Sequence, residues 1–110
     1  MARRVVDAIA DKKGEDVLLL DLREISILAD YFVIGSVASE RQTRAVVSGV
    51  KQEVRETLGV TPLRVEGKAA TGWVLMDYGG VVVHVFSPEM RAYYDLEGLW
   101  QDARIVVRML

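Results

Sequence analysis

The side chains best suited to acid–base chemistry are the only histidine, His84, and the acid Asp77 seven residues before it. If Gly79 and Gly80 form a two-residue turn between two strands, these side chains lie diagonally on one face and can share a hydrogen bond or an ion pair. Such an acid can orient an imidazole as a general base. A lone strand histidine is more often structural, however, and no serine or threonine stands in a recognisable nucleophile motif. We therefore predict no catalytic residue, no metal site and no cofactor.

One enzymatic alternative comes from Gly35 and Ser36, which follow a predicted strand and precede a predicted helix. This arrangement is reminiscent of nucleotidyltransferases, in which closely spaced carboxylates bind two metal ions and a triphosphate. After Ser36 the sequence offers only Glu40, on the predicted helix, and Glu66, alone on the next strand. A small enzyme of nucleotidyltransferase type therefore stays an alternative that lacks its carboxylate pair, because an architecture can be shared without its chemistry.

The elements that must position these residues can be read from apolar spacing and from helix-capping residues. Residues 2–13 have helical spacing, and Gly14 is placed to end that helix in the left-handed conformation. Ser39 and Gln42 form a capping box at the start of a long helix that Gly59 ends. Ser87, followed by Pro88 and Glu89, starts a helix that continues to about residue 94, before a short helix capped by Asp95. Strands are predicted at 16–22, 31–34, 63–66, 73–78 and 81–86.

The predicted order is helix, two strands, helix, three strands, helix. It indicates an α/β or α+β fold for residues 1–110, a single domain with a five-stranded mixed sheet flanked by about three helices. The last residues, 101–110, are treated as a C-terminal tail that either docks on the body or remains mobile.

The hairpin around Gly79 and Gly80 has two unlike faces. One face is nearly all aliphatic, as a core requires, whereas the other mixes aromatic residues with an acid and the histidine: Trp73, Leu75, Asp77, Val82, His84 and Phe86. Three helices can hardly cover both faces of five strands, so the mixed face is a candidate interaction patch with an aromatic anchor. The alternative is that a helix covers this face and Trp73 belongs to the core.

The long helix carries a basic stripe on the side opposite its apolar residues, spaced three or four positions apart: Arg41, Arg44, Ser48, Lys51 and Arg55. A solvated face explains such a stripe most simply. The alternative is contact with RNA phosphate, which would add a salt-sensitive contribution to binding.

Composition limits the classes of function. The 110 residues have a net charge of −2, and a free-standing nucleic-acid binder is usually basic. There are no cysteines, and no apolar run approaches the ~20 residues needed to cross a membrane. The first residues lack the apolar region of a secretory signal or a transit-like leader, so we expect a protein of the bacterial cytoplasm.

Residues 29–100 carry a series of short motifs in order and in register, and the predicted elements before them also fit. Together these motifs resemble those of the ribosomal silencing factor (Iojap-like) family: Asp30-Tyr31-Phe32-Val33-Ile34, Ser39-Glu40-Arg41-Gln42, Val65-Glu66-Gly67, Gly72-Trp73, Asp77-Tyr78-Gly79, Val83-His84-Val85-Phe86, Arg91, Tyr94-Asp95-Leu96-Glu97 and Leu99-Trp100. Gly98 departs from the pattern, because the family usually has a charged or bulky residue there.

The resemblance implies a nucleotidyltransferase-like architecture without catalysis, in a protein that is not an enzyme. It implies binding to large ribosomal subunit protein fourteen where the small subunit docks, which would block subunit joining and reduce translation when nutrients are scarce. It also implies a homodimer in the free state, and a purely dimeric scaffold is a further alternative. The positions that match family motifs are expected to contact the partner, and hairpin geometry adds two more: Trp73, Asp77, His84, Arg91 and Tyr94, with Leu75 and Phe86. Arg41, Arg44, Lys51 and Arg55 are the RNA-facing candidates.

Overall fold

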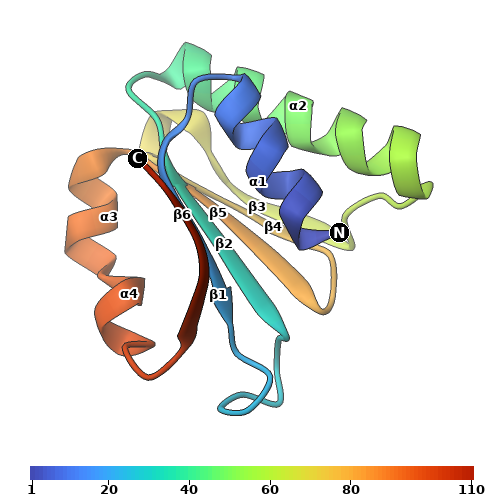
Figure 1. Ribbon diagram of the computed structural model, residues 1–110. Helices are drawn as coiled ribbons and strands as arrows, with labels where there is room; N and C mark the ends of the chain where they lie inside the picture. Colours follow the sequence, from blue (N-terminus) through green and yellow to red (C-terminus); the bar gives the residue numbers. More distant parts are fainter.

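The computed structural model describes residues 1–110 as one mixed sheet with helices on both of its faces (Figure 1). The elements are α1 (Ala2–Asp11), β1 (Glu15–Asp21), β2 (Tyr31–Ser36), α2 (Glu40–Leu58), β3 (Arg64–Lys68), the 3-10 helix η1 (Ala69–Thr71), β4 (Trp73–Asp77), β5 (Val81–Phe86), α3 (Pro88–Tyr94), α4 (Leu96–Leu99) and β6 (Arg104–Met109). The strand order is β3-β4-β5-β2-β1-β6. Helices α1 and α2 cover one face, and α3 and α4 lie against the other.

The predicted fold class is confirmed, but the predicted strand count is wrong, because the sheet has six strands and not five. The tail forms β6, which pairs antiparallel with β1 from Val17↔Met109 to Asp21↔Arg104. The physical reason lies in β1, whose apolar residues are buried on both faces of the sheet. A strand of that kind needs a hydrogen-bonded neighbour on each side, and β2 supplies only one of them.

The β4–β5 hairpin has the predicted register, with Trp73 opposite Phe86 and Leu75 opposite His84. Tyr78 donates its backbone N–H to the carbonyl of the residue after the turn across 2.9 Å, which closes the two-residue connection. Only one of the two turn glycines, Gly79, has a positive φ (89°). The hairpin therefore presents the two faces that the alternation of side chains predicts.

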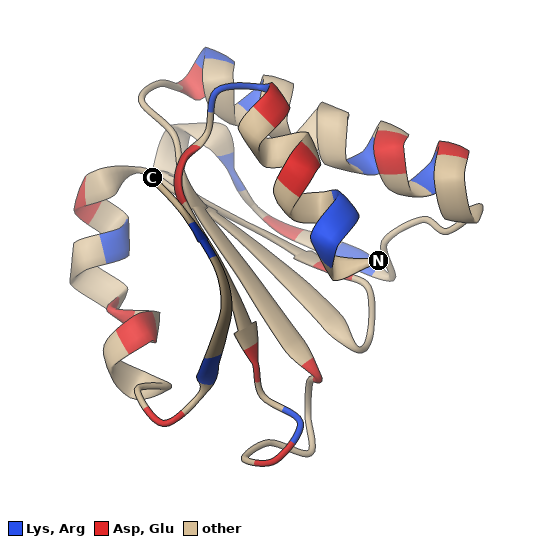
Figure 2. Ribbon diagram, in the orientation of Figure 1, with Lys and Arg blue, Asp and Glu red and all other residues tan.

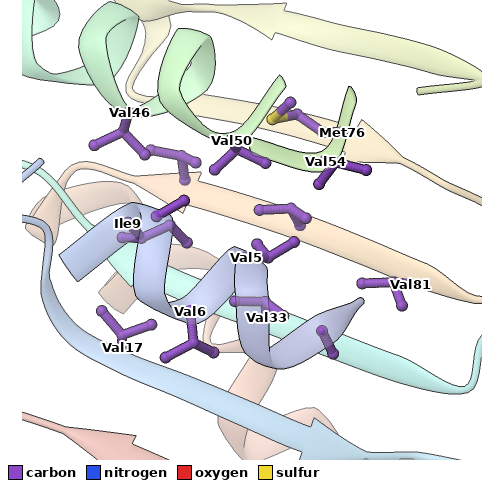
Figure 3. Packing of buried hydrophobic residues seen from close by; sticks show 14 of the residues in the cluster. Val5, Val6, Ile9, Val17, Val33, Val46, Val50, Val54, Met76 and Val81 are labelled. Carbon is purple, nitrogen blue, oxygen red and sulfur yellow. The ribbon is translucent and has the colours of Figure 1, made fainter. Parts of the chain in front are cut away.

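The main core lies between the sheet and helices α1 and α2 (Figure 3). Val5 and Ile9 of α1 and Val46, Val50 and Val54 of α2 are fully buried in it. Both helices present one apolar stripe at helical spacing, so their opposite sides remain polar. None of the helices combines the length and the apolar character that crossing a membrane requires.

Helix α2 begins at the predicted cap, where Ser39 Oγ accepts from the backbone N–H of Gln42 (3.1 Å). The side chain of Gln42 reaches back one residue further than a capping box predicts, to the N–H of Ala38 (2.6 Å). Its amide nitrogen donates to the carbonyl of Lys13 (2.7 Å), so the cap also ties α2 to the end of α1. Gly59 ends α2 with the expected left-handed φ of 67°.

Gly14 does not adopt the predicted left-handed conformation after α1. Lys13 does so instead, with a φ of 68°. A Cβ on Gly14 would collide with Cγ2 of Ile9, which is fully buried. A glycine is therefore required at position 14 because the chain passes close to the core, and not because of its own φ.

Candidate protein-interaction surface

A second, smaller core of aromatic and aliphatic side chains fills the space between the sheet and helices α3 and α4. Trp73 of β4 lies at its margin, with its ring centroid 5.2 Å from that of Phe86 and 4.3 Å from that of Tyr94. Aromatic rings at these separations stabilise one another beyond the area that they bury. The stack thus joins β4, β5 and α3 around the half-buried indole of Trp73.

Helix α3 covers only part of the mixed face, so the face is divided between buried and partly exposed residues. Phe86 and His84 are buried, with exposed fractions of 1% and 3%, and belong to the core. Trp73 and Leu75 are half-buried, and Tyr94 is 39% exposed. Beside them the surface is hollowed by about 250 Å³, and the hollow is lined by Glu66, Gly67, Thr71, Trp73, Leu75, Met90 and Tyr94. We call this hollow the Trp73 groove.

His84 lies under the aromatic residues and not beside an acid. Its Nδ1 accepts a hydrogen bond from the indole Nε1–H of Trp73 (3.2 Å), and its ring centroid lies 4.6 Å from that of Phe32. Burial lowers the pKa of His84 to about 4, because an apolar environment disfavours the charged imidazolium. The imidazole is therefore neutral at physiological pH.

The predicted pairing of Asp77 with His84 is wrong. The Asp77 carboxylate accepts from Arg64 Nε (3.1 Å) and from the backbone N–H of Gly79 (2.8 Å). Asp77 stands at the mouth of the turn, where a backbone donor and an edge-strand arginine are both within reach. It therefore lies near the rim of the mixed face, away from the aromatic stack.

Arg91 is buried, with an exposed fraction of 7%, and does not lie on the surface of the Trp73 groove. Its Nη1 donates to the carbonyl of Asp16 (2.7 Å) and to Ser36 Oγ (2.8 Å), and its Nε donates to Glu97 (2.9 Å). Asp16 has a positive φ of 46°, an unusual conformation for a residue other than glycine. These bonds connect α3 and α4 to β1 and β2.

The structure thus divides the seven predicted partner-contact residues. Trp73, Leu75 and Tyr94 meet around one groove, Asp77 lies near the rim, and Phe86, His84 and Arg91 support the surface from below. Sequence reasoning missed Met90, which lines the groove from α3. No sequence signal identifies Met90, because its position depends on how α3 is rotated over the sheet.

The basic stripe on α2 is exposed at all four predicted positions: Arg41, Arg44, Lys51 and Arg55. The same helix also carries Glu40, Glu53 and Glu56, so α2 shows both signs of charge along its length (Figure 2). Glu40 pairs with Arg44 across 3.6 Å. Two alternatives, a solvated face and a surface for RNA, are compatible with this arrangement.

The pair reminiscent of nucleotidyltransferases has a structural role here. Ser36 Oγ accepts from the buried Arg91, and a Cβ on Gly35 would lie 3.0 Å from Cγ2 of Ile9. The structure brings together no group of three or more His, Cys, Asp or Glu side chains that could hold a metal ion. Gly98 departs from the family motif. Its lack of a side chain leaves room for the carboxylate of Asp95, which caps α4 by accepting from the N–H of Gly98 (3.2 Å).

Comparison with known proteins identifies relatives over most of the chain. Residues 1–109 match the family described as "Ribosomal silencing factor during starvation". A protein of Halalkalibacterium halodurans named "Ribosomal silencing factor RsfS" is 46% identical over 101 residues, which span 92% of this chain and 86% of that protein. A crystal structure of a Chromobacterium violaceum protein superimposes with a TM-score of 0.84 at 36% identity, covering 90% of this chain and 82% of the other.

A mouse protein named "Mitochondrial assembly of ribosomal large subunit protein 1" is 34% identical over 98 residues, which cover 87% of this chain and 43% of the mouse protein. The bacterial relatives of this chain are named ribosomal silencing factors, which is a regulatory role and not an enzymatic one. The chain therefore belongs to the ribosomal silencing factor family, and it is not an enzyme.

Proposed function

We propose that this chain binds the large ribosomal subunit through the surface around Trp73 and prevents the small subunit from joining. The proposed contact is large ribosomal subunit protein fourteen, on the face where the small subunit docks. Membership of the silencing family supports a role at the ribosome, and the name of the mouse relative supports the large subunit as the partner. Translation would fall because fewer subunits could join, and nutrient limitation is the condition in which this is useful.

The Trp73 groove is the observation that carries the proposal. It combines a half-buried indole, an exposed tyrosine ring and aliphatic walls from Leu75 and Met90. Tryptophan and tyrosine are the side chains most often found to dominate binding energy, because they bury a large rigid surface and retain one polar group. A partner side chain that fills the groove would exclude water from these apolar walls.

The proposed mechanism is steric and needs no chemical step. The folded chain measures 34 × 33 × 24 Å, so when docked on an intersubunit face it occupies volume that the small subunit requires. The support beneath the groove matters for this role. Buried His84 ties β5 to β4 through Trp73, and buried Arg91 ties α3 to β1 and β2. The groove is therefore formed before the partner arrives, and little ordering entropy is lost on binding.

Two further contacts extend the proposal. Arg41, Arg44, Lys51 and Arg55 would lie near ribosomal RNA phosphate and make docking sensitive to salt. In the free state two copies would pair as a homodimer, with the mixed face as the shared surface. Dimerisation and ribosome binding would then compete, so dimer formation at high protein concentration would lower the apparent affinity for the ribosome.

Sedimentation of ribosomal subunits through a sucrose gradient tests the function. Purified small and large subunits are mixed with the protein at a magnesium concentration that promotes association. We expect the protein to migrate with large subunits and the joined-ribosome peak to fall. If the protein stays at the top of the gradient and the peak is unchanged, the proposal is wrong. Thermal stabilisation by a nucleotide with magnesium would then favour the nucleotidyltransferase alternative.

A further inference from the structure

Strand β3 forms one edge of the sheet, with β4 on one side and no strand on the other. All five of its residues are exposed. An unpaired edge presents N–H and C=O groups that can hydrogen-bond to another strand. Proteins recognise extended segments in this way, with the backbone giving affinity and the flanking hollows giving specificity.

The hydrogen bonds of β4 identify which groups of β3 face outward. Along a strand, the backbone N–H and C=O groups of successive residues point alternately to the two neighbouring strands. Tyr78 donates its N–H to the first residue of β5. Leu75 lies an odd number of residues earlier, so its backbone groups point to the opposite side, toward β3. Its partner there is Glu66. The backbone groups of Glu66 therefore point toward β4. Those of its two neighbours, Val65 and Gly67, point to the open edge.

Each face of the sheet is hollowed beside this edge. The Trp73 groove reaches Glu66 and Gly67 on one face. On the other face a hollow of about 260 Å³ lies between β3 and α2, lined by Thr43, Arg44, Val47, Ser48, Val65, Gly67, Ala69 and Val74. A side chain on Gly67 would collide with the carbonyl oxygen of Trp73, so this position stays bare. Because the side chains of an added strand alternate between faces, one hollow is available to each set.

The hollow on the α2 side contains a basic side chain, whereas the Trp73 groove contains the acidic Glu66. On the α2 side the floor is apolar, from Val47, Val65 and Val74, and Arg44 supplies a guanidinium. The pairing of Arg44 with Glu40 is exposed on both partners and spans 3.6 Å, so it contributes little and a stronger partner can replace it. A carboxylate on an added strand would find its complement in Arg44.

We propose that β3 receives an extended segment of the protein partner, which adds to the sheet as a seventh strand. The segment bonds to the outward backbone groups of Val65 and Gly67. It places an apolar side chain in the Trp73 groove on one face and an acidic side chain against Arg44 on the other. The inference rests on the proposed function for its partner, the large ribosomal subunit, and specifies how the contact is made.

The opposite edge of the sheet is less suited to this role. Arg104 and Arg108 of β6 pair with Asp21 and Asp16 of β1 (both 3.5 Å). The hollow at the start of β6 is lined mainly by charged side chains, namely Asp21, Arg23, Glu24, Asp102 and Arg104, with Ile25. An apolar anchor has no comparable place there.

Binding to purified large ribosomal subunits, measured by co-pelleting over a range of concentrations, tests the inference with two variants of one residue. Val65→Pro removes the outward N–H and keeps the bonds of β3 to β4, because proline is tolerated on edge strands. It is expected to weaken binding about tenfold, since a partner carbonyl loses its donor. Val65→Ala keeps the N–H and is expected to weaken binding less than about threefold. Melting curves verify that both variants fold.

Hydrogen exchange of the wild-type protein provides a second measurement that needs no variant. The amides of Val65 and Gly67 are expected to exchange at least about tenfold more slowly when large subunits are bound, because they become hydrogen-bonded. If they exchange equally fast with and without subunits, the inference is wrong. This measurement decides the question if Val65→Pro does not fold.

Charge reversal separates the acidic segment from RNA phosphate. Arg44→Glu is expected to weaken binding about tenfold more than Arg41→Glu does, because Arg41 lies on the same stripe but outside the hollow and so loses only the RNA contribution. Equal losses with a reduced salt dependence would assign the stripe to RNA and overturn the acidic side chain. If the wild-type protein does not pellet with subunits, the proposed function and this inference both fail. If it pellets and Val65→Pro binds equally well, only the inference fails.

Discussion

The indole N–H of Trp73 donates to Nδ1 of His84 across 3.2 Å, so a half-buried ring at the margin of the aromatic core is bonded to a buried polar ring of the sheet. Because Nδ1 accepts, the neutral imidazole carries its proton on Nε2. The bond fixes the orientation of the Trp73 ring over β5. It also couples the shape of the groove to the protonation of a buried histidine.

Lowering the pH from about 6.5 to about 4 is expected to reduce the free energy of unfolding. In the unfolded chain His84 binds a proton near its ordinary pKa of 6.5, whereas in the folded chain its pKa is about 4. The unfolded state therefore holds more protons in this window, and stability falls with pH by about 3 kcal/mol at most. Urea unfolding at pH 7.0 and 4.5 measures the change. A His84→Gln variant should lack this slope, and equal slopes in both proteins would contradict the prediction.

Replacing Arg91 by Ala is expected to lower stability by about 2 to 4 kcal/mol. The guanidinium is buried, and its loss leaves the Asp16 carbonyl and the Ser36 hydroxyl without their donor. Urea unfolding monitored by tryptophan fluorescence gives the difference. Arg44→Gln serves as the control, because its exposed pair with Glu40 contributes less than about 0.5 kcal/mol. A loss for Arg91→Ala no larger than that of the control would show that the buried contacts are not needed.

Gly67→Ala is expected to cost more stability than Gly59→Ala, although both glycines have a positive φ. A Cβ at position 59 meets nothing within 4 Å, so only the backbone penalty of about 1 kcal/mol applies. At position 67 the Cβ would also collide with the Trp73 carbonyl and push β3 away from β4. Thermal unfolding should show a loss above about 2 kcal/mol for Gly67→Ala. Similar melting temperatures for the two variants would mean that β3 shifts without cost.

Tyr94→Ala is expected to weaken binding to large ribosomal subunits at least about tenfold, because the ring forms one wall of the Trp73 groove. Tyr93, the adjacent residue, is 78% exposed and does not line the groove. Tyr93→Ala is therefore the matched control and should bind within about threefold of the wild type. Equal losses for both variants would mean that the partner contacts the outer side of α3. Co-pelleting gives the affinities, and melting temperatures show whether the fold is retained.

Deleting residues 104–110 is expected to destabilise the domain, because β1 would become an edge strand with apolar side chains on both faces. A truncation that removes only Leu110, which is 92% exposed and follows β6, should have almost no effect. Circular dichroism melting compares the two. If the longer truncation melted at the wild-type temperature, β6 would be dispensable for the sheet.

Much of the fold could be predicted from local patterns. The register of the hairpin followed from two glycines and the alternation of side chains, and the start and end of α2 followed from Ser39 and Gly59. These features depend on interactions between residues that are close in the chain, so they can be predicted from the sequence alone. The sixth strand could not be predicted in the same way, because β6 is defined by its pairing with a segment more than 80 residues earlier.

The candidate site shows the same division. The sequence alone determined that Trp73, Leu75, His84 and Phe86 share one face of a hairpin, because alternation along a strand is a local property. Only the tertiary structure decided that His84 pairs with Trp73 and not with Asp77, and that Arg91 is buried and not a surface contact. Those outcomes depend on the pairing of β3, which brings Arg64 to Asp77, and on the packing of α3, which places Arg91 against β1 and β2. Such contacts join segments that are distant in the sequence, so a local pattern does not contain them.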